Sequence, residues 1–205
     1  MNTNSSMISS ENGHDNKIRC AWCGTDPLYV SYHDREWGVP VHDDRVLYED
    51  LTLDGAQAGL SWLTILKKRE NYRRAFHNFD FERIARYDSS DISRLMSDRG
   101  IVRNRLKIEA AITNAGAVID ICEEFGSFDA FVWRYVDGRP IQNAWKSAGA
   151  VPSSSRQSDM MSRDLKKRGF RFAGTVICYA FMQASGMVND HLRDCFRYEA
   201  VSRMA

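Results

Sequence analysis

Cysteine and histidine residues near both ends of the chain have types and spacings that suit a metal site. They lie in three stretches: "CAWC" with Cys20 and Cys23, "YHDREWG" with His33, and "HLRDC" with His191 and Cys195. Residues four apart share one face of a helix, so His191 and Cys195 can hold one ion together, and zinc accepts mixed thiolate and imidazole ligands. The alternatives are unrelated core and surface residues, or a redox pair formed by Cys20 and Cys23.

A basic, glycine-containing segment near the C-terminus has the composition of a phosphate-binding turn. In "LKKRGFRFAGTVICYAFMQASG" a helix ends in basic residues that include Lys167, Gly169 permits a tight turn, Arg171 follows, and Gly174 precedes a new helix. Backbone N–H groups at such a turn and at a helix N-terminus can bind phosphate, and basic side chains add attraction. The alternative is a corner between two helices whose basic residues are solvated. A second basic cluster, "KKRENYRR" at 67–74, is equally well an exposed helix face.

The stretch Leu53–Trp62, "LDGAQAGLSW", combines an acid, two glycines and a tryptophan. Each glycine would cost a helix about 1 kcal/mol relative to alanine, which indicates that something comes close to this backbone. Asp54 is the acid, and Tyr32, Trp37 and Trp62 supply aromatic surfaces. A flat heterocycle stacked on aromatic rings and hydrogen-bonded by a carboxylate is how proteins read a base flipped out of a duplex. The alternative is that the tryptophans are core residues and Asp54 is an acid at a helix end.

Most of the chain shows the periodicity of α-helices, and no alternation of comparable length predicts strands. The clearest apolar stripe recurs at intervals of three and four residues and comprises Ile108, Ala111, Ile112, Ala115, Val118, Ile119 and Cys122. Ser61 and Ser127 are expected to cap two further helices. Ser158 is expected to begin another helix, which Gly169 ends, after a surface loop at 146–159. The predicted fold class is therefore all-α.

Length and composition favour a single globular domain. The 205 residues are enough to bury a core without disulfides or an oligomeric partner. Residues 1–18 are polar and lack the features of a signal or transit peptide, so we expect a disordered tail, followed by one domain over 19–205 in a cytoplasmic monomer. No apolar run has the length of about 20 residues that a membrane span needs. The five cysteines are expected to be reduced, and the net charge of +1 leaves any nucleic-acid binding to local clusters.

Taken together, these stretches resemble the 3-methyladenine DNA glycosylase I family. The residues that carry the resemblance run in order from Arg19 to Cys195 and include "RCAWC", "DPLYVSYHDREWGVP", "LDGAQAGLSWLTILKKRENYRRAF" and "LKKRGFRFAGTVICYAFMQASGMVNDH". The resemblance implies an all-helical, helix–hairpin–helix DNA glycosylase fold that removes 3-methyladenine from alkylated double-stranded DNA. It also implies a structural Zn²⁺ that joins the two termini, and no need for a protein partner.

The resemblance assigns binding roles to two sets of residues. The zinc ligands would be Cys20, His33, His191 and Cys195. The residues that bind the DNA backbone would be Lys167, Gly169, Arg171 and Gly174. Cys23 would then be an extra thiol outside the family pattern.

The resemblance also assigns a base pocket centred on Asp54, the catalytic residue. Asp54 would hydrogen-bond a base held between the rings of Tyr32 and Trp62. Gly59 and Leu60 would lie against the gap left in the duplex, so the glycines would let the backbone approach DNA and base. The family's acid is usually a glutamate, and a carboxylate shorter by one methylene could lose about 1.5 to 3 kcal/mol of hydrogen bonding.

Two rival functions use the same residues. A non-catalytic zinc-containing DNA-binding module with a drifted base pocket would bind duplex DNA without releasing a base. A thiol-based redox or metal-sensing protein would depend on Cys23 rather than on Trp62. No residue is expected to act as a general base, because Asp190, which follows the hairpin helix, lies next to the expected ligand His191.

Overall fold

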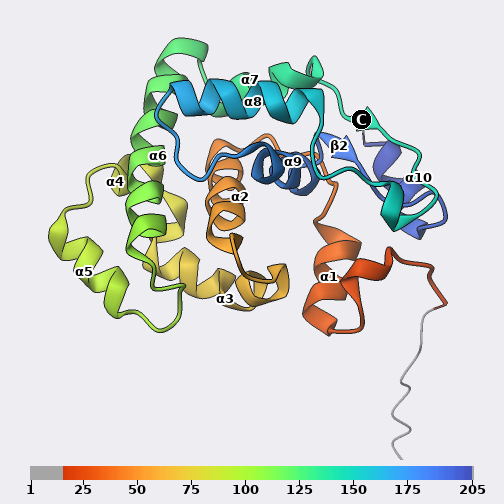
Figure 1. Ribbon diagram of the computed structural model, residues 1–205, viewed down its shortest axis with the longest axis horizontal. Coiled ribbons are helices and arrows are strands. Elements are labelled where there is room, and N and C mark those ends of the chain that lie inside the picture. The colour runs from red at the N-terminus through yellow and green to blue at the C-terminus, as the bar shows by residue number, and fades with distance from the viewer. Residues whose placement is uncertain (1–15, 205) are drawn as a thin grey trace, which may run out of the picture.

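The computed structural model describes residues 16–204 and is built mainly from α-helices (Figure 1). Within these residues the α-helices are α1 (Pro27–Arg35), α2 (Asp44–Gln57), α3 (Trp62–Ala75), α4 (Phe81–Ile84), α5 (Ser89–Ser97), α6 (Arg105–Phe125), α7 (Phe128–Trp133), α8 (Arg156–Lys167), α9 (Thr175–Ala184) and α10 (Phe196–Ser202). The 3₁₀ turns there are η1 (Ala21–Cys23), η2 (His77–Phe79), η3 (Arg134–Val136) and η4 (Ala148–Ala150). The mostly helical character expected from the sequence is confirmed. Residues 1–15 of the expected tail lie outside the described residues.

One short strand pair departs from a purely helical chain. β1 (Ile141–Gln142) and β2 (Val188–Asn189) run parallel, with Ile141 opposite Val188. The Ile141 N–H donates to the Met187 carbonyl at 2.9 Å. Sequence reasoning missed this pair because strands of two residues are too short to show alternation.

α2 is the centre of the fold. It packs against α3, α6, α7 and α9, and Figure 1 shows it in the middle of these helices. Its buried residues cover every face of the helix and include Leu47, Leu51 and Leu53. A helix buried all round is normally apolar, yet α2 also carries the buried acids Glu49 and Asp54. Acids in such a position must be paired or kept neutral.

The long helix α6 lies on one side of α2, with α4 and α5 beyond it, and the N-terminal and C-terminal segments lie on the other side of α2 (Figure 1). The stripe predicted for α6 faces inward, since Ile108, Ala111 and Val118 are buried. At the opposite side the Phe196 N–H donates to the Ile18 carbonyl at 2.9 Å. The N-terminal and C-terminal segments therefore share one edge of the fold.

Local capping sets where several helices begin and end. The side-chain oxygens of Ser61 and Ser127 accept backbone N–H groups in the first turns of α3 and α7, as predicted. The prediction for Ser158 is corrected, because Ser155 is the N-cap of α8 and Ser158 is its reciprocal partner inside the first turn. Gly169 follows α8 with a φ of +86°, a left-handed conformation that favours glycine, and it ends that helix as predicted.

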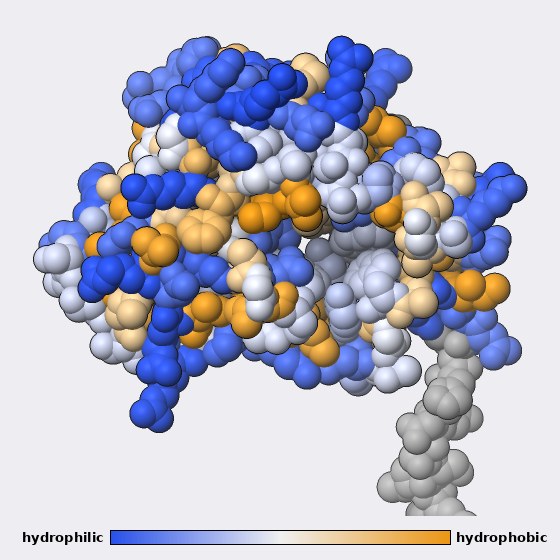
Figure 2. Space-filling view, in the orientation of Figure 1, coloured by the Kyte–Doolittle hydropathy of each residue, from blue (hydrophilic) through white to orange (hydrophobic). Residues whose placement is uncertain are grey.

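The surface is mostly hydrophilic, with single hydrophobic side chains scattered over the face in Figure 2. Large exposed hydrophobic side chains of the described residues include Leu60, Leu106 and Val176. Across residues 16–204, no helix combines the length and apolar character needed to cross a membrane.

Gly186 joins two parts of the fold, and its substitution is expected to destabilise the protein strongly. A Cβ on Gly186 would lie 2.5 Å from Pro40 N and 2.6 Å from Val39 O, and its φ is +71°. Because backbone cannot yield as a flexible side chain can, Gly186→Ala should lower the free energy of unfolding by about 3 kcal/mol or more. Gly116, inside α6, has open space where a Cβ would go, so Gly116→Ala should raise that free energy by about 1 kcal/mol. Urea denaturation measures the free energy of unfolding of both variants. Equal changes in the two would contradict the packing argument.

Candidate functional site

A cavity of about 460 Å³ opens between α1, α2, α3, α9 and the segment around η4. Its aromatic walls are Trp22, Tyr29, Tyr32, Trp37 and Trp62. Asp54 reaches it from α2, and Gln183 and Asp190 reach it from α9 and the segment that follows β2. The structure thus brings Tyr32, Asp54 and Trp62 together as predicted. It adds Trp22 and Tyr29, which sequence reasoning did not single out because isolated aromatic residues carry no spacing signal.

Asp54 is the one α2 acid that lines this cavity. Only 5% of the residue is exposed, and its Oδ2 atom has no hydrogen-bond partner among the described residues. Burial, and then the nearby Asp50 carboxyl, raise the pKa of Asp54 well above its usual value. The Trp62 indole N–H is likewise buried without a partner. One acceptor and one donor are therefore left for a bound molecule.

The rings of Tyr32 and Trp62 do not form an aromatic sandwich. Their centroids are 5.5 Å apart and their planes are tilted by 52°, so the two rings contact each other. A base held between them would need the rings to separate. The expectation of a base between Tyr32 and Trp62 does not fit this geometry, and a flat ring has room only against their cavity-facing surfaces.

Asp50 is a half-buried acid that sequence reasoning missed, although it lies one helical turn before Asp54 on the same face of α2. Burial and the neighbouring Glu49 raise the pKa of Asp50 to about 8. Glu49 itself is held by Arg73, whose Nε donates to Glu49 Oε1 at 2.8 Å. Glu49, Asp50 and Asp54 thus have different environments, and of these three acids only Glu49 has a direct cationic partner among the described residues.

Asp190 holds three segments together beside the cavity. Its Oδ1 atom accepts hydrogen bonds from Asn143 and Trp145, and its Oδ2 atom accepts them from Tyr179 and Gln183, each at 2.7 Å. A carboxylate has about four acceptor positions, so these donors occupy all of them. All four acceptor positions of Asp190 are therefore engaged by donors of the protein itself.

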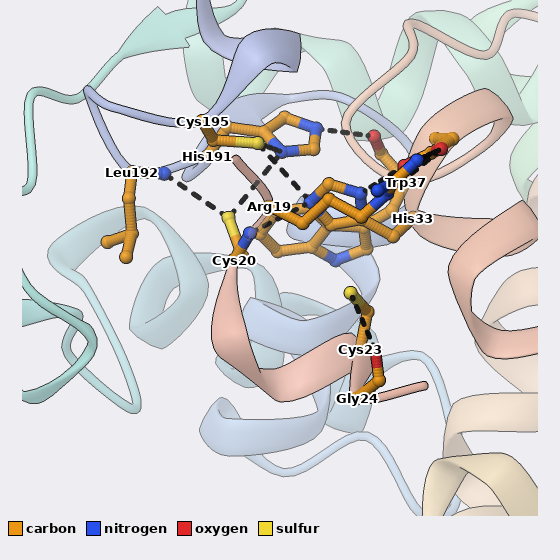
Figure 3. A network of polar contacts seen from close by, with 10 residues as sticks. Arg19, Cys20, Cys23, Gly24, His33, Trp37, His191, Leu192 and Cys195 are labelled. Carbon is orange, nitrogen blue, oxygen red and sulfur yellow. Dashed lines mark hydrogen bonds and ion pairs between the residues drawn. The ribbon is translucent and has the colours of Figure 1, made fainter. Parts of the chain in front are cut away.

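The four expected metal ligands form one buried cluster at the edge where the chain ends meet (Figure 3). Their donor atoms lie within 4.8 Å of one another. Cys195 Sγ is 3.4 Å from His33 Nε2 and 3.5 Å from His191 Nδ1, and Cys20 Sγ is 3.7 Å from His191 Nδ1. A tetrahedral zinc site with ordinary bond lengths separates its sulfur and nitrogen ligands by about 3.6 Å. The spacing and the donor types therefore fit zinc.

The neighbours of the two histidines orient both rings toward this cluster. His33 Nδ1 donates to Asp34 Oδ1 at 2.8 Å, which leaves Nε2 facing the sulfur atoms. His191 Nε2 donates to the Trp37 carbonyl at 3.0 Å, which leaves Nδ1 facing them. Such partners fix the nitrogen that a metal-binding histidine presents.

One detail of the expected metal site is corrected. His191 and Cys195 do not share a helix face, because the chain turns between them and Cys195 is the N-cap of α10. The Cys195 N–H donates to the Leu192 carbonyl at 2.8 Å, and this turn brings the two donors together. Cys23 lies apart from the four ligands in Figure 3, and its thiol is directed to the Gly24 carbonyl. It belongs to η1, without the strand and helix of a thioredoxin-type redox motif.

The predicted basic turn connects α8 and α9, which pack against each other. Lys167 and Arg171 are exposed, and Gly174 is the N-cap of α9 without a side-chain cap. Asn114 of α6 fixes the turn: its Nδ2 donates to the Arg171 carbonyl at 3.0 Å, and the Arg171 N–H donates to its Oδ1 at 2.8 Å. The turn therefore presents a free helix N-terminus and two basic side chains on a fixed backbone.

The second basic cluster is largely committed to ion pairs. Lys67 Nζ lies 2.8 Å from Asp26 Oδ2, Arg69 pairs with Glu36, and Arg73 pairs with Glu49 and Glu70. Three of these acids lie elsewhere in the sequence and Glu70 lies within the cluster itself, and together they pair with these cations. The reading of residues 67–74 as a helix face fits the structure better than a binding site.

The two glycines of "LDGAQAGLSW" have different roles. Gly55 is buried inside α2, and a Cβ there would lie 3.2 Å from Phe172 Cβ, so this glycine lets α2 approach the turn before α9. The expectation that it brings backbone to DNA or base is corrected. Gly59 has a φ of +79° in the exposed loop between α2 and α3, with open space around it. Leu60, beside it, is 41% exposed.

Comparison with known proteins places this chain among methyladenine glycosylases. The sequence profile of the methyladenine glycosylase family matches residues 22–198. DNA-3-methyladenine glycosylase 1 of Escherichia coli K12 is 49% identical over 180 residues, which are 88% of this chain and 96% of that protein. The DNA-3-methyladenine glycosylase of Haemophilus influenzae is 46% identical over 177 residues, covering 86% and 96% of the two chains.

Solved structures of similar proteins have the same fold. A crystal structure of a 3-methyladenine DNA glycosylase I has a TM-score of 0.84 and 53% identity, and covers 87% of this chain and 98% of that one. A structure of the Staphylococcus aureus 3-methyladenine DNA glycosylase I, which describes recognition of 3-methyladenine, has a TM-score of 0.85 and 40% identity, with 87% and 95% covered.

The pKa of Asp50 makes the stability of this protein depend on pH. Because the folded state raises that pKa from 3.8 to about 8, the wild type should lose stability relative to Asp50→Asn as pH rises through this window. The relative loss is at most about 1.4 kcal/mol per pH unit.

Urea unfolding at several pH values between about 5 and 8 measures this loss of stability. Asp26, whose pKa is lowered by its hydrogen bond with Lys67, supplies the control, since the difference between wild type and Asp26→Asn should stay constant over this range. A free energy of unfolding that rises with pH in the wild type relative to Asp50→Asn would contradict the burial argument.

Proposed function

Because the chain belongs to the methyladenine glycosylase family, we infer that it is a DNA-3-methyladenine glycosylase, a base-excision repair enzyme that hydrolyses the bond between 3-methyladenine and deoxyribose in DNA. The observation that carries this function is the aromatic cavity with a buried, unpartnered Asp54 carboxyl. The base must leave the duplex to reach this cavity, since a stacked base is inaccessible to the protein.

The reaction places little demand on acid or base catalysis. Methylation at N3 gives the base a positive charge while it is attached to the sugar. When the bond between N9 and C1′ breaks, the electron pair stays with the base, which leaves as neutral 3-methyladenine. A water oxygen bonds to C1′ and its proton goes to solvent. The four hydrogen bonds on Asp190 support a reaction without a general base at that position.

We propose that Asp54 recognises the charge and the amino group of the methylated base. A cation in the cavity favours the ionised carboxyl, which offsets the burial that otherwise keeps Asp54 neutral. The carboxylate can then accept a hydrogen bond from the exocyclic amino group. Unmethylated adenine is neutral and gives no such compensation, so the carboxylate would remain buried without a counter-charge. The same group therefore binds the damaged base and rejects the normal one.

We propose that alkylated duplex DNA lies over the turn between α8 and α9, which would act as a helix–hairpin–helix element. Gly169 and Gly174 would place backbone N–H groups near a phosphate, and Lys167 and Arg171 would add positive charge. Gly59 and Leu60 would fill the gap left by the flipped nucleotide, which their exposed position on the α2–α3 loop supports. Binding of this kind is independent of base sequence and weakens with salt.

We propose that Cys20, His33, His191 and Cys195 hold a structural zinc ion. Four buried donors of soft and borderline type, spaced for a tetrahedron, support this assignment. All four positions are protein ligands, which is typical of a structural site and not of a catalytic one. The zinc would join the segment before α1 to the segment before α10, and it takes no part in the hydrolysis.

We further propose that residues 19–205 work as one domain and as a cytoplasmic monomer without a protein partner. The cavity is built within one chain, which supports a site complete in the monomer. The similar enzymes named above come from bacteria, whose DNA lies in the cytoplasm.

Release of 3-methyladenine from methylated duplex DNA tests the function directly. Asp54→Asn should lower kcat/KM by about 10- to 150-fold, the equivalent of the 1.5 to 3 kcal/mol of a hydrogen bond to a charged group. Asn has the same shape and cannot ionise, so this variant should be at least as stable as the wild type at neutral pH. Chromatography of the released base, beside Asp54→Ala and Asp54→Glu, measures the effect.

The results of this assay distinguish a glycosylase from a non-catalytic DNA-binding module. An active wild type beside an impaired Asp54→Asn supports the glycosylase and the role of the carboxyl. A wild type that binds duplex DNA and releases no base would instead support the DNA-binding module with a drifted pocket. Full activity in Asp54→Asn would contradict the proposed role of this residue.

Zinc content and thermal unfolding test the metal site. The purified wild type should contain one zinc ion per chain by elemental analysis, and Cys195→Ala should lose it. We expect the melting temperature to fall by about 10 °C, because loss of a structural metal removes at least about 3 kcal/mol of folding free energy. Cys23→Ala is the matched control, since Cys23 is buried in the same segment but outside the cluster, and it should keep its zinc. A wild type that folds equally well after chelation would refute the structural role.

A further inference from the structure

The loop between α2 and α3 is tied to α6 by one lysine side chain. Lys107, in the first turn of α6, extends its Nζ to the carbonyl oxygens of Ala56 and Ala58, each at 2.7 Å. These carbonyls belong to the last turn of α2 and to the residue that follows it. Burial of the ammonium group lowers the pKa of Lys107.

This contact has a clear local reason. The last carbonyls of a helix have no partner within the helix, and they carry the negative end of its dipole. A lysine at this position satisfies two carbonyls and supplies a positive charge where the dipole favours it. The chain then reverses at Gly59, whose φ is +79°, and the Leu60 N–H donates to the Gln57 carbonyl at 2.6 Å.

The consequence concerns Leu60. Its side chain is 41% exposed, and Gly59 beside it has no heavy atom within 4 Å of the place where a Cβ would lie. Little packing therefore holds the tip of the loop in place. The two hydrogen bonds from Lys107 are the side-chain contacts that fix the base of this loop to a second helix.

We propose that Lys107 is a positioning residue for excision, because it holds the Gly59–Leu60 loop ready to enter the gap that a flipped nucleotide leaves in the duplex. The proposal rests on the proposed function. In this proposal Lys107 donates to the protein's own carbonyls and does not bind a DNA phosphate. The charge of Lys107 and its position near the loop would also suit a phosphate-binding residue. Without Lys107 the loop would have to be ordered at the moment of DNA binding.

The test compares kcat/KM on methylated duplex DNA for the wild type and Lys107→Met, which keeps the length of the side chain and removes its donors. We expect a loss of about tenfold, which corresponds to the cost of ordering about one backbone residue. Lys107→Arg restores donors and should recover most of the activity. Lys68→Met is the matched control, because Lys68 donates to the carbonyls of Arg99 and Gly100 in a different turn. It should leave kcat/KM within about twofold of the wild type.

Two further measurements separate positioning from other roles. Binding of free 3-methyladenine, followed by tryptophan fluorescence, should be unchanged in Lys107→Met, because the free base needs the cavity and not the loop. The slope of log affinity for duplex DNA against log salt concentration should also be unchanged in Lys107→Met. In Arg171→Gln the slope should become less steep by the amount expected for about one phosphate contact. A reduced slope in Lys107→Met would overturn the proposal in favour of a phosphate contact. Weaker binding of the free base would overturn it in favour of damage to the cavity.

A double-mutant cycle links the lysine to the loop. If Lys107 acts through Leu60, then Lys107→Met should have little further effect in a Leu60→Ala background. Additive losses would refute the proposal. If Lys107→Met does not fold, Lys107→Gln, which keeps an amide donor, takes its place in the cycle. A wild type that releases no 3-methyladenine refutes the proposed function, whereas an active wild type with a fully active Lys107→Met refutes only the role of this lysine.

Discussion

Burial of an unpartnered carboxyl on the central helix is the constraint on which the rest of this structure depends. Asp54 has no hydrogen bond at Oδ2, and the described residues place no cation against it. Such a group costs folding free energy, so the surrounding helices must hold it in place. α2 provides that support because α3, α6, α7 and α9 enclose it. An acid on a surface helix would stay hydrated and ionised, and it could not respond to the charge of a bound base.

The same constraint underlies the proposed discrimination of a methylated base by Asp54. Adenine and 3-methyladenine have nearly the same shape, so wall contacts alone separate them weakly. Their charges in DNA differ by one unit, and in a dry cavity a unit charge interacts much more strongly with a carboxyl than it does in water. A base seated against the aromatic rings would displace water from the cavity, and these rings offer π-faces to a cation. In the proposed role of Asp54 the discrimination would therefore come mainly from electrostatics, and the burial of this side chain would matter more than its shorter length.

Sequence reasoning found the parts of the fold and site that depend on residue type and local spacing. Ser61, Ser127 and Gly169 act within one turn of their own positions, so their roles follow from local chemistry. The four Cys and His residues, which form one cluster, could be named as candidates because few other side chains can hold a metal. The rest depends on distances between segments far apart in the chain. Nothing local shows that Phe172 lies against Gly55, and the tilt between Tyr32 and Trp62 follows only from packing.

The candidate metal cluster and the aromatic cavity share a wall, so the residues of this cluster also contribute to the shape of the cavity. Cys20 and Leu192 line the cavity, and the Leu192 N–H donates to Cys20 Sγ at 3.4 Å. The backbone carbonyl of Trp37, another residue of the cavity wall, accepts a hydrogen bond from His191 Nε2. Trp22 lies between Cys20 and Cys23, and its ring centroid is 4.8 Å from that of Trp37. Loss of the cluster would therefore release the aromatic side of the cavity first, while Asp54 on the opposite side remains fixed by the packing of α2. Segments near the two ends of the described chain thus complete a cavity whose buried acid lies on the central helix α2.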